Sequence, residues 1–146
     1  MKRVLVTGGT VFVSRFVATW FAENGYEVFV LNRANRPQPQ NTTLIQADRH
    51  QLGSCLKHLS FDAVLDITAY DAQDIHDLLN ALGSFNDYIF ISSSAVYPET
   101  LSQPFTETQP LGPNAIWGKY GTDKIAAEQA LLQSVPNVYI LRPPYL

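Results

Sequence analysis

The chain has little of what secreted, membrane-spanning or nucleic-acid-binding proteins depend on. Cys55 is the only cysteine among 146 residues, which excludes an internal disulfide and favours a reducing, cytoplasmic location. We expect its thiol to be buried as a small apolar group. No segment reaches the roughly 20 consecutive apolar residues of a membrane-spanning helix. The net charge is −3 and no cluster of lysines or arginines offsets it, which argues against binding to a phosphate backbone.

The sequence also lacks the spacing of a metal site. Its three histidines, His50, His58 and His76, fall on separate segments, and no cluster of cysteine or carboxylate ligands accompanies them. We therefore predict no bound metal. The hydrophobic fraction of 46% and the charged fraction of 16% are typical of a folded globular protein. The length favours a single domain.

Apolar segments alternate between strand-like and helix-like patterns along the whole chain. We predict helices over 12–21 and 71–82, a short helix through 52–59, and a helix from about 120 to 131. Gly25 and Gly83 stand where a glycine ends a helix, and Asp71 stands at a helix-capping position. The predicted strands cover 4–6, 27–31, 44–45, 61–67, 88–91 and 138–141.

These strands are continuously apolar, as strands covered by helices on both faces are. Right-handed crossovers between them favour an α/β fold with a doubly wound parallel sheet, the Rossmann fold, in the order 3-2-1-4-5-6. Ligands of such a sheet bind beyond the carboxyl ends of its strands. The residues that follow each strand therefore carry the functional prediction.

A glycine pair follows the first strand and opens the first helix. The segment 7–10 reads TGGT, which lets the backbone turn sharply and directs the free amides at the start of the helix toward an anion such as a pyrophosphate. Glycines also occupy turns for purely steric reasons. The position between a strand and a helix favours the phosphate-binding interpretation.

A second pattern joins the fifth strand to the last helix. Tyr120 and Lys124 are four residues apart and therefore share one helix face. Three serines, Ser92 to Ser94, follow the fifth strand. Tyrosine and lysine at this spacing also occur on ordinary amphipathic helices. The two interpretations are separated by the resemblance of the upstream serine segment to a known family.

Together these segments resemble the extended short-chain dehydrogenases, which include nucleotide-sugar epimerases and dehydratases. The segments 7–14, 91–97 and 120–124 read TGGTVFVS, ISSSAVY and YGTDK, where the family has TGGTGFIG, ISSxxVYG and YxxxK. Val11 and Ser14 replace two family glycines. The segment 104–107, PFTE, is similar to the family's PxxE turn, although a loop with a capping threonine explains it equally well. The segment 141–146 is similar to the start of RPxxxYGP.

The resemblance implies a catalytic group of Ser93, Tyr120 and Lys124. A phenol with a pKa of about 10 is a poor base at neutral pH until a nearby ammonium favours the phenolate. The family's serine orients the substrate oxygen, its tyrosine transfers a proton as hydride moves, and its lysine lowers the tyrosine pKa and binds the nicotinamide ribose.

The resemblance also implies a dinucleotide site. Arg33 stands after the second strand, where an acidic residue would bind the ribose of NAD, so NADP is favoured over NAD; the alternative is a solvated loop cation. Asp48 matches the residue that meets the adenine amino group, or else caps a loop. The implied contacts are Gly8, Gly9, Thr10, Val11, Phe12, Val13, Asn32, Arg33, Asp48, Arg49, Ile67, Thr68, Ala69, Tyr70, Tyr120, Lys124 and Pro144.

We therefore predict an NAD(P)-dependent epimerase, dehydratase or reductase that acts on a nucleotide-linked sugar or similar polyol. Residues 1–146 would be its cofactor-binding domain, either the N-terminal part of a longer enzyme or a truncated product, because extended members continue with a substrate domain. The family also allows a homodimer formed through the helices after the fourth and fifth strands. The alternative is a non-catalytic atypical Rossmann protein that senses a dinucleotide or binds RNA, like the chloroplast stem-loop RNA-binding proteins of the same superfamily.

Overall fold

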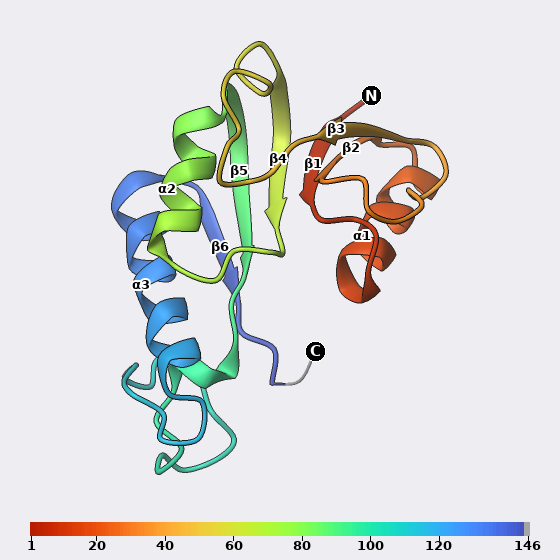
Figure 1. The fold of residues 1–146 in the computed structure, drawn as a ribbon. Helices are drawn as coiled ribbons and strands as arrows, with labels where there is room; N and C mark the ends of the chain where they lie inside the picture. The colour runs from red at the N-terminus through yellow and green to blue at the C-terminus, as the bar shows by residue number, and fades with distance from the viewer. Residues whose placement is uncertain (145–146) are drawn as a thin grey trace.

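A six-stranded parallel sheet forms the centre of the molecule (Figure 1). The computed structural model describes residues 1–144, so Tyr145 and Leu146, which end the predicted RPxxxYGP-like segment, lie outside the described residues. The strand order is β3-β2-β1-β4-β5-β6, which confirms the predicted Rossmann topology. The strands are β1 Arg3–Thr7, β2 Glu27–Asn32, β3 Thr42–Gln46, β4 Ser60–Asp66, β5 Ser84–Ile91 and β6 Val138–Leu141.

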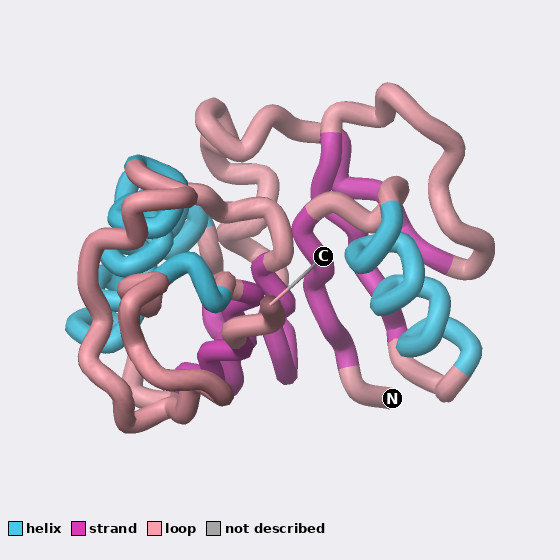
Figure 2. The backbone as a smooth tube through the Cα atoms, turned by 90° about the horizontal axis from the view of Figure 1, so that it is seen from below, coloured by secondary structure: helices cyan, strands magenta, loops and turns pink. Residues whose placement is uncertain are grey.

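Helices cover the two faces of this sheet. Helix α1 (Phe12–Glu23) lies on one side, while α2 (Ala72–Ala81) and α3 (Lys119–Ser134) lie on the other (Figure 2). A 3-10 turn, η1 (Ser94–Val96), follows β5. A large core fills the space beneath α2 and α3, and a smaller one lies beneath α1. None of the helices in the described part of the chain is long and apolar enough to cross a membrane.

Helix α1 meets the sheet through small side chains. Its buried residues are Ser14 and Ala18, which allow the helix to approach the strands closely. The large side chains of the same helix lie mostly outside, with Phe12 72% and Phe16 71% exposed. Gly25 ends the helix with a φ of +87°, as predicted for a left-handed closing glycine.

Two predictions about helices are wrong. The short helix expected through 52–59 is a series of turns, because Gly53 adopts a left-handed φ of +56°, which a right-handed helix does not accommodate. Gly83 does not close α2 as a left-handed residue, because the helix already ends at Leu82 in an extended conformation. A Cβ at Gly83 would lie 2.6 Å from the carbonyl oxygens of Lys57 and Leu59. Close approach of two backbones explains this glycine.

Of the remaining local predictions, the cap of α2 is confirmed and the burial of the cysteine is wrong. Asp71 caps α2 as expected, and its carboxylate accepts a hydrogen bond from the Asp74 amide at 2.9 Å. Cys55 is exposed, so its predicted burial is wrong. In the turns at 53–58 the next residue, Leu56, is fully buried and takes the core position, which leaves the thiol on the outer side.

Candidate active site

Three segments that the sequence singled out lie together at the carboxyl edge of the sheet. A Cβ at Gly8 would lie 3.0 Å from Thr68, so the turn after β1 touches the loop after β4. A Cβ at Gly121 would overlap the carbonyl oxygen of Ala95, so the start of α3 is pressed onto the backbone that follows β5. The glycine turn, the serine segment and the tyrosine helix therefore surround one region.

The turn between β1 and α1 has the geometry of a phosphate cradle. Gly8 and Gly9 have φ angles of +88° and +98°, and a Cβ at Gly9 would lie 2.7 Å from Val30. Helix α1 begins after Val11 without a side-chain cap, so its first amides receive no acceptor from that residue. Ser14 donates its hydroxyl hydrogen to the Val11 carbonyl at 2.8 Å. The residues present thus fit an anionic group at this helix end.

Three arginines lie at the loop after β2, two of them, Arg33 and Arg36, within the loop itself. The Asn32 amide donates to the Gly8 carbonyl at 2.7 Å, and its oxygen accepts from the Ala34 amide at 2.8 Å; these bonds hold the loop against the glycine turn. Arg33 follows and is exposed. Arg15 of α1 donates to the Pro37 carbonyl at 3.0 Å and so brings a third cation to the same loop. The sequence interpretation missed Arg15, because its distance from this loop along the chain hides the contact.

Lys124 is buried beside the tyrosine ring. Its side chain donates to the carbonyls of Ala69 at 2.8 Å and Ile91 at 3.1 Å. The ammonium lies 5.8 Å from the ring centroid of Tyr120. Burial lowers the pKa of Lys124 below its ordinary value, and the negative charge of Asp66 opposes this effect in part. The amine is therefore fixed between the ends of β4 and β5, near the rings of Phe90, Tyr70 and Tyr120, whose centroids lie at 4.9, 5.6 and 5.8 Å.

Tyr120 and Ser93 lie on neighbouring segments. Tyr120 is 37% exposed, and the rings of Tyr70 and Trp117 lie at 6.4 and 5.9 Å from its ring centroid. The Ser93 oxygen accepts a hydrogen bond from the Ala95 amide at 3.1 Å, which leaves the hydroxyl hydrogen available to another acceptor. The contact of Gly121 with this segment places both side chains at the same edge of the sheet. Their catalytic roles remain predictions.

A buried glutamate, Glu128, holds the serine segment through a hydrogen bond, and the sequence analysis did not identify it. Glu128 accepts from the Ser92 hydroxyl at 2.6 Å and from Arg142 at 2.6 and 3.1 Å. Arg142 also donates to the Tyr97 hydroxyl at 2.8 Å. The hydrogen bonds that Arg142 donates to the Glu128 carboxylate raise the pKa of Arg142 above its ordinary value. The signal was present, because Glu128 continues the four-residue spacing of the predicted pair.

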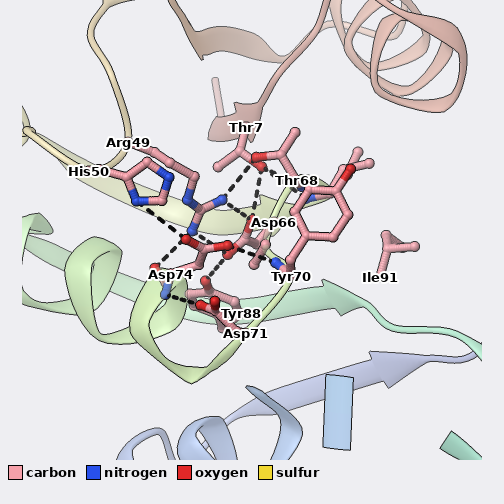
Figure 3. Close-up of polar contacts among 12 residues, drawn as sticks. Thr7, Arg49, His50, Asp66, Thr68, Tyr70, Asp71, Asp74, Tyr88 and Ile91 are labelled. Atoms are coloured by element: carbon pink, nitrogen blue, oxygen red, sulfur yellow. Dashed lines mark hydrogen bonds and ion pairs between the residues drawn. The ribbon is translucent and has the colours of Figure 1, made fainter. Parts of the chain in front are cut away.

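A second buried cluster surrounds Asp66 at the end of β4 (Figure 3). Its carboxylate accepts from the Thr7 hydroxyl at 2.9 Å, from Arg49 at 2.9 and 3.2 Å, and from the Tyr88 hydroxyl. Burial alone would raise the pKa of Asp66, but the Arg49 charge and these donors hold it below the ordinary value. The carboxylate therefore stays ionised inside the protein.

The same cluster fastens the loop after β4. Arg49 also donates to the Thr68 hydroxyl at 2.8 Å and to the Asp74 carbonyl at 2.9 Å, and the Thr7 hydroxyl oxygen accepts from the Ile67 amide at 2.8 Å. Asp48 accepts from the His50 amide at 2.9 Å. The guanidinium thus points inward. The predicted contact of Asp48 and Arg49 with adenine stays a prediction.

The other residues of the predicted cofactor site belong to segments at the carboxyl edge of the sheet. Thr10 and Val13 belong to the β1–α1 turn and the first turn of α1, and Ile67 and Tyr70 belong to the fastened loop. Pro144 lines a cavity of about 680 Å³ beside the loop that follows β5. Across residues 1–144, no group of three histidine, cysteine or acidic side chains is placed to hold a metal ion.

Solved structures of nucleotide-sugar epimerases have the same fold as this chain. The UDP-Glc/GlcNAc 4-epimerase of Campylobacter jejuni matches with a TM-score of 0.79 at 18% identity, over 97% of this chain and 53% of that one. The UDP-glucuronic acid 4-epimerase of Bacillus cereus, solved with UDP-glucuronic acid and NAD, matches with a TM-score of 0.75 at 20% identity, over 96% and 55%. The chain therefore shares the Rossmann fold of these epimerases over about half of their length.

Sequence relatives agree with this resemblance, although no protein-family model matches the chain. The chloroplast stem-loop binding protein of 41 kDa b of Arabidopsis thaliana is 25% identical in an alignment of 162 positions that covers 97% of this chain. The 2'-dehydrokanamycin reductase of Streptomyces kanamyceticus is 28% identical over 134 residues, which cover 88%. The chain spans 43% and 37% of these relatives, less than half of either. The predicted resemblance to the short-chain dehydrogenase superfamily is confirmed.

Proposed function

We propose that this chain is the cofactor-binding and catalytic domain of an NAD(P)-dependent epimerase, dehydratase or reductase that acts on a sugar or a similar polyol. The observation that carries the proposal is the position of Lys124. Its ammonium is buried next to the Tyr120 ring and bonded to Ile91, directly before the serine segment. Buried ammonium, phenol and hydroxyl at one sheet edge form the set that carbonyl–alcohol chemistry needs.

The bound dinucleotide would supply the hydride acceptor or donor. Ser93 would donate its free hydroxyl hydrogen to the substrate oxygen, and Tyr120 would exchange a proton with that oxygen. Lys124 favours the phenolate of Tyr120 through its positive charge. An ammonium has three N–H donors and two of them serve Ala69 and Ile91. The third remains for a ribose hydroxyl.

The glycine turn and the arginine loop would hold the other half of the cofactor. The uncapped start of α1 suits the pyrophosphate. Arg33 and Arg15 flank the loop after β2, where a 2'-phosphate would lie, and no acidic residue stands at the end of β2 to repel it. We therefore propose a preference for NADP over NAD. NADPH and NADH titrations, followed by nicotinamide fluorescence, test this preference.

The expected result is tighter binding of NADPH, with Arg33→Ala lowering the affinity for NADPH and leaving that for NADH unchanged. Tighter NADH binding by the wild-type protein would refute the preference. The catalytic assignment is tested with Tyr120→Phe in a panel of nucleotide sugars. Loss of general acid–base catalysis should lower turnover by about 10²- to 10⁴-fold while dinucleotide binding is retained. Full turnover in this variant would remove the catalytic role.

A second candidate function is a non-catalytic nucleotide or RNA binder. The name of the Arabidopsis relative, together with Val11 and Ser14 in place of two family glycines, favours it. A filter-retention assay with a stem-loop RNA at physiological salt distinguishes the two candidates, because nonspecific binding by a chain of charge −3 should be lost there. Retention of RNA without dinucleotide binding would support the second candidate.

A further inference from the structure

The cavity beside the serine segment lies where a substrate would reach the predicted catalytic tyrosine. Its volume of about 680 Å³ falls within the ~300–1,000 Å³ of small-molecule sites. The loop after β5 and the segment after β6 form its walls, and both lie at the carboxyl edge of the sheet (Figure 1). Trp117 lines the cavity, and its ring centroid is 5.9 Å from that of Tyr120. Tyr120 itself does not line the cavity, so Trp117 links the cavity wall to the tyrosine.

The charges on the cavity wall are negative. Glu99 and Glu107 line it, and Arg142 is the single cation in the described part of the wall. The charge of Arg142 is already matched by Glu128, whose carboxylate it contacts through two nitrogens. Glu99 accepts a hydrogen bond from the Ala115 amide at 2.8 Å, and this bond lowers the pKa of its carboxyl. Glu99 and Glu107 thus face the cavity, and the one cation in the described part of the wall is already paired with Glu128.

Three aromatic rings, those of Tyr97, Phe105 and Trp117, form another part of the wall. The Tyr97 ring lies 4.9 Å from Phe105 and 5.3 Å from the Arg142 guanidinium, so the protein itself surrounds it. Trp117 is 51% exposed. Asn114, which is buried, accepts hydrogen bonds from the amides of Ile116 and Trp117 at 2.9 and 3.0 Å. The backbone that carries the indole is therefore fixed before any ligand arrives.

We infer that this cavity binds a hydroxylated ring that carries a free ammonium group, that is, an amino sugar. An ammonium gains from both carboxylates and from an indole face, whereas a carboxylate or phosphate on the same ring would be repelled. The ring hydroxyls suit the polar wall, and the substrate oxygen would extend past Trp117 toward Ser93 and Tyr120, which do not line the cavity. The inference rests on the proposed function, because it takes the ring in the cavity to be the substrate of that site.

Three sugars with the same ring and different charge test the inference. Glucosamine is positive, N-acetylglucosamine is neutral and glucuronic acid is negative at pH 7. Binding is followed by Trp117 fluorescence in a Trp20→Phe background, with NADP⁺ present at saturation. We expect glucosamine to bind about tenfold more tightly than N-acetylglucosamine, because each exposed carboxylate contributes a factor of about two to five. Glucuronic acid should not bind detectably.

Matched variants separate the charge effect from general damage. Glu99→Gln and Glu107→Gln should each weaken glucosamine binding by about two- to fivefold and leave N-acetylglucosamine binding unchanged. Glu23→Gln, an exposed glutamate at the far end of α1, serves as the control and should change neither. Raising the salt concentration should reduce the preference for glucosamine, since exposed charges are screened.

Equal affinity for glucosamine and N-acetylglucosamine would overturn the inference, and so would unchanged glucosamine binding in both glutamine variants. Failure of all three sugars to perturb Trp117 up to their solubility would also overturn it. These outcomes leave dinucleotide binding and the Tyr120→Phe result untouched, so the proposed function would survive them. Conversely, a preference for glucosamine in a protein that binds no dinucleotide would refute the proposed function alone.

Discussion

Replacing Asp66 with asparagine should destabilise the protein strongly while changing its shape very little. The carboxylate is completely buried and matches the charge of Arg49, whose side chain is only 12% exposed. Asparagine would leave that charge uncompensated, which costs about 3–5 kcal/mol in buried pairs. This is a large part of the roughly 5–15 kcal/mol that stabilises a typical protein. At about 2–4 °C per kcal/mol, the melting temperature should fall by roughly 6–20 °C.

Urea unfolding followed by circular dichroism at pH 7 measures this change. The control is Glu27→Gln, which removes an exposed ion pair with Arg3 at 3.3 Å and should cost about 1 kcal/mol or less. The double variant Arg49→Met with Asp66→Asn should recover most of the loss, because neither partner then leaves a buried charge alone. A loss in Asp66→Asn no larger than that of the control would refute the reasoning.

Three further predictions concern pH, packing and the thiol. Because the folded pKa of Asp66 is lowered, its contribution to stability is complete above the ordinary pKa of about 3.9 and is lost as pH falls through the folded value. The difference in unfolding free energy between the wild type and Asp66→Asn should therefore hold from neutral pH down to about 5 and narrow below about 4 in urea titrations; a constant difference at lower pH would contradict this. Gly121→Ala should cost about 1–3 kcal/mol by overpacking against Ala95, whereas Thr122→Ala at the exposed neighbouring position should not, as thermal unfolding would show. Cys55 is exposed and should react with an aromatic disulfide reagent in the native protein as completely as in urea; protection until unfolding would contradict its placement.

The topology of the sheet could be predicted from the sequence because it follows from the alternation of strands and helices along the chain. Strands such as 61–67 and 138–141 have apolar centres, and the connections between them leave few topologies open. The ends of the strands were readable for the same reason, since parallel strands bring their carboxyl ends to one edge. The predicted set around Gly8, Ser93 and Tyr120 required no knowledge of side-chain geometry to be placed at that edge.

The buried polar clusters were not readable, because their partners are distant in the sequence. Arg49 donates to the carboxylate of Asp66 and to the backbone carbonyl of Asp74, which belong to two other segments. Nothing in the sequence around Arg49 distinguishes it from an exposed loop arginine. Leu52 and Leu56 have helical spacing, yet the left-handed Gly53 between them prevents a helix. Glu128 is the exception, since its spacing from Lys124 already placed it on the same face.

The carboxylate of Asp66 belongs to β4, yet it receives hydrogen bonds from Thr7 of β1, from Tyr88 of β5 and from Arg49 beyond β3. Separating any one of these strands would strip a buried charge of a donor, so the middle of the sheet should open as a single cooperative unit. Amide protons of β1, β4 and β5 would then exchange with solvent at a common rate, set by complete unfolding of the domain, while β6 at the margin exchanges sooner.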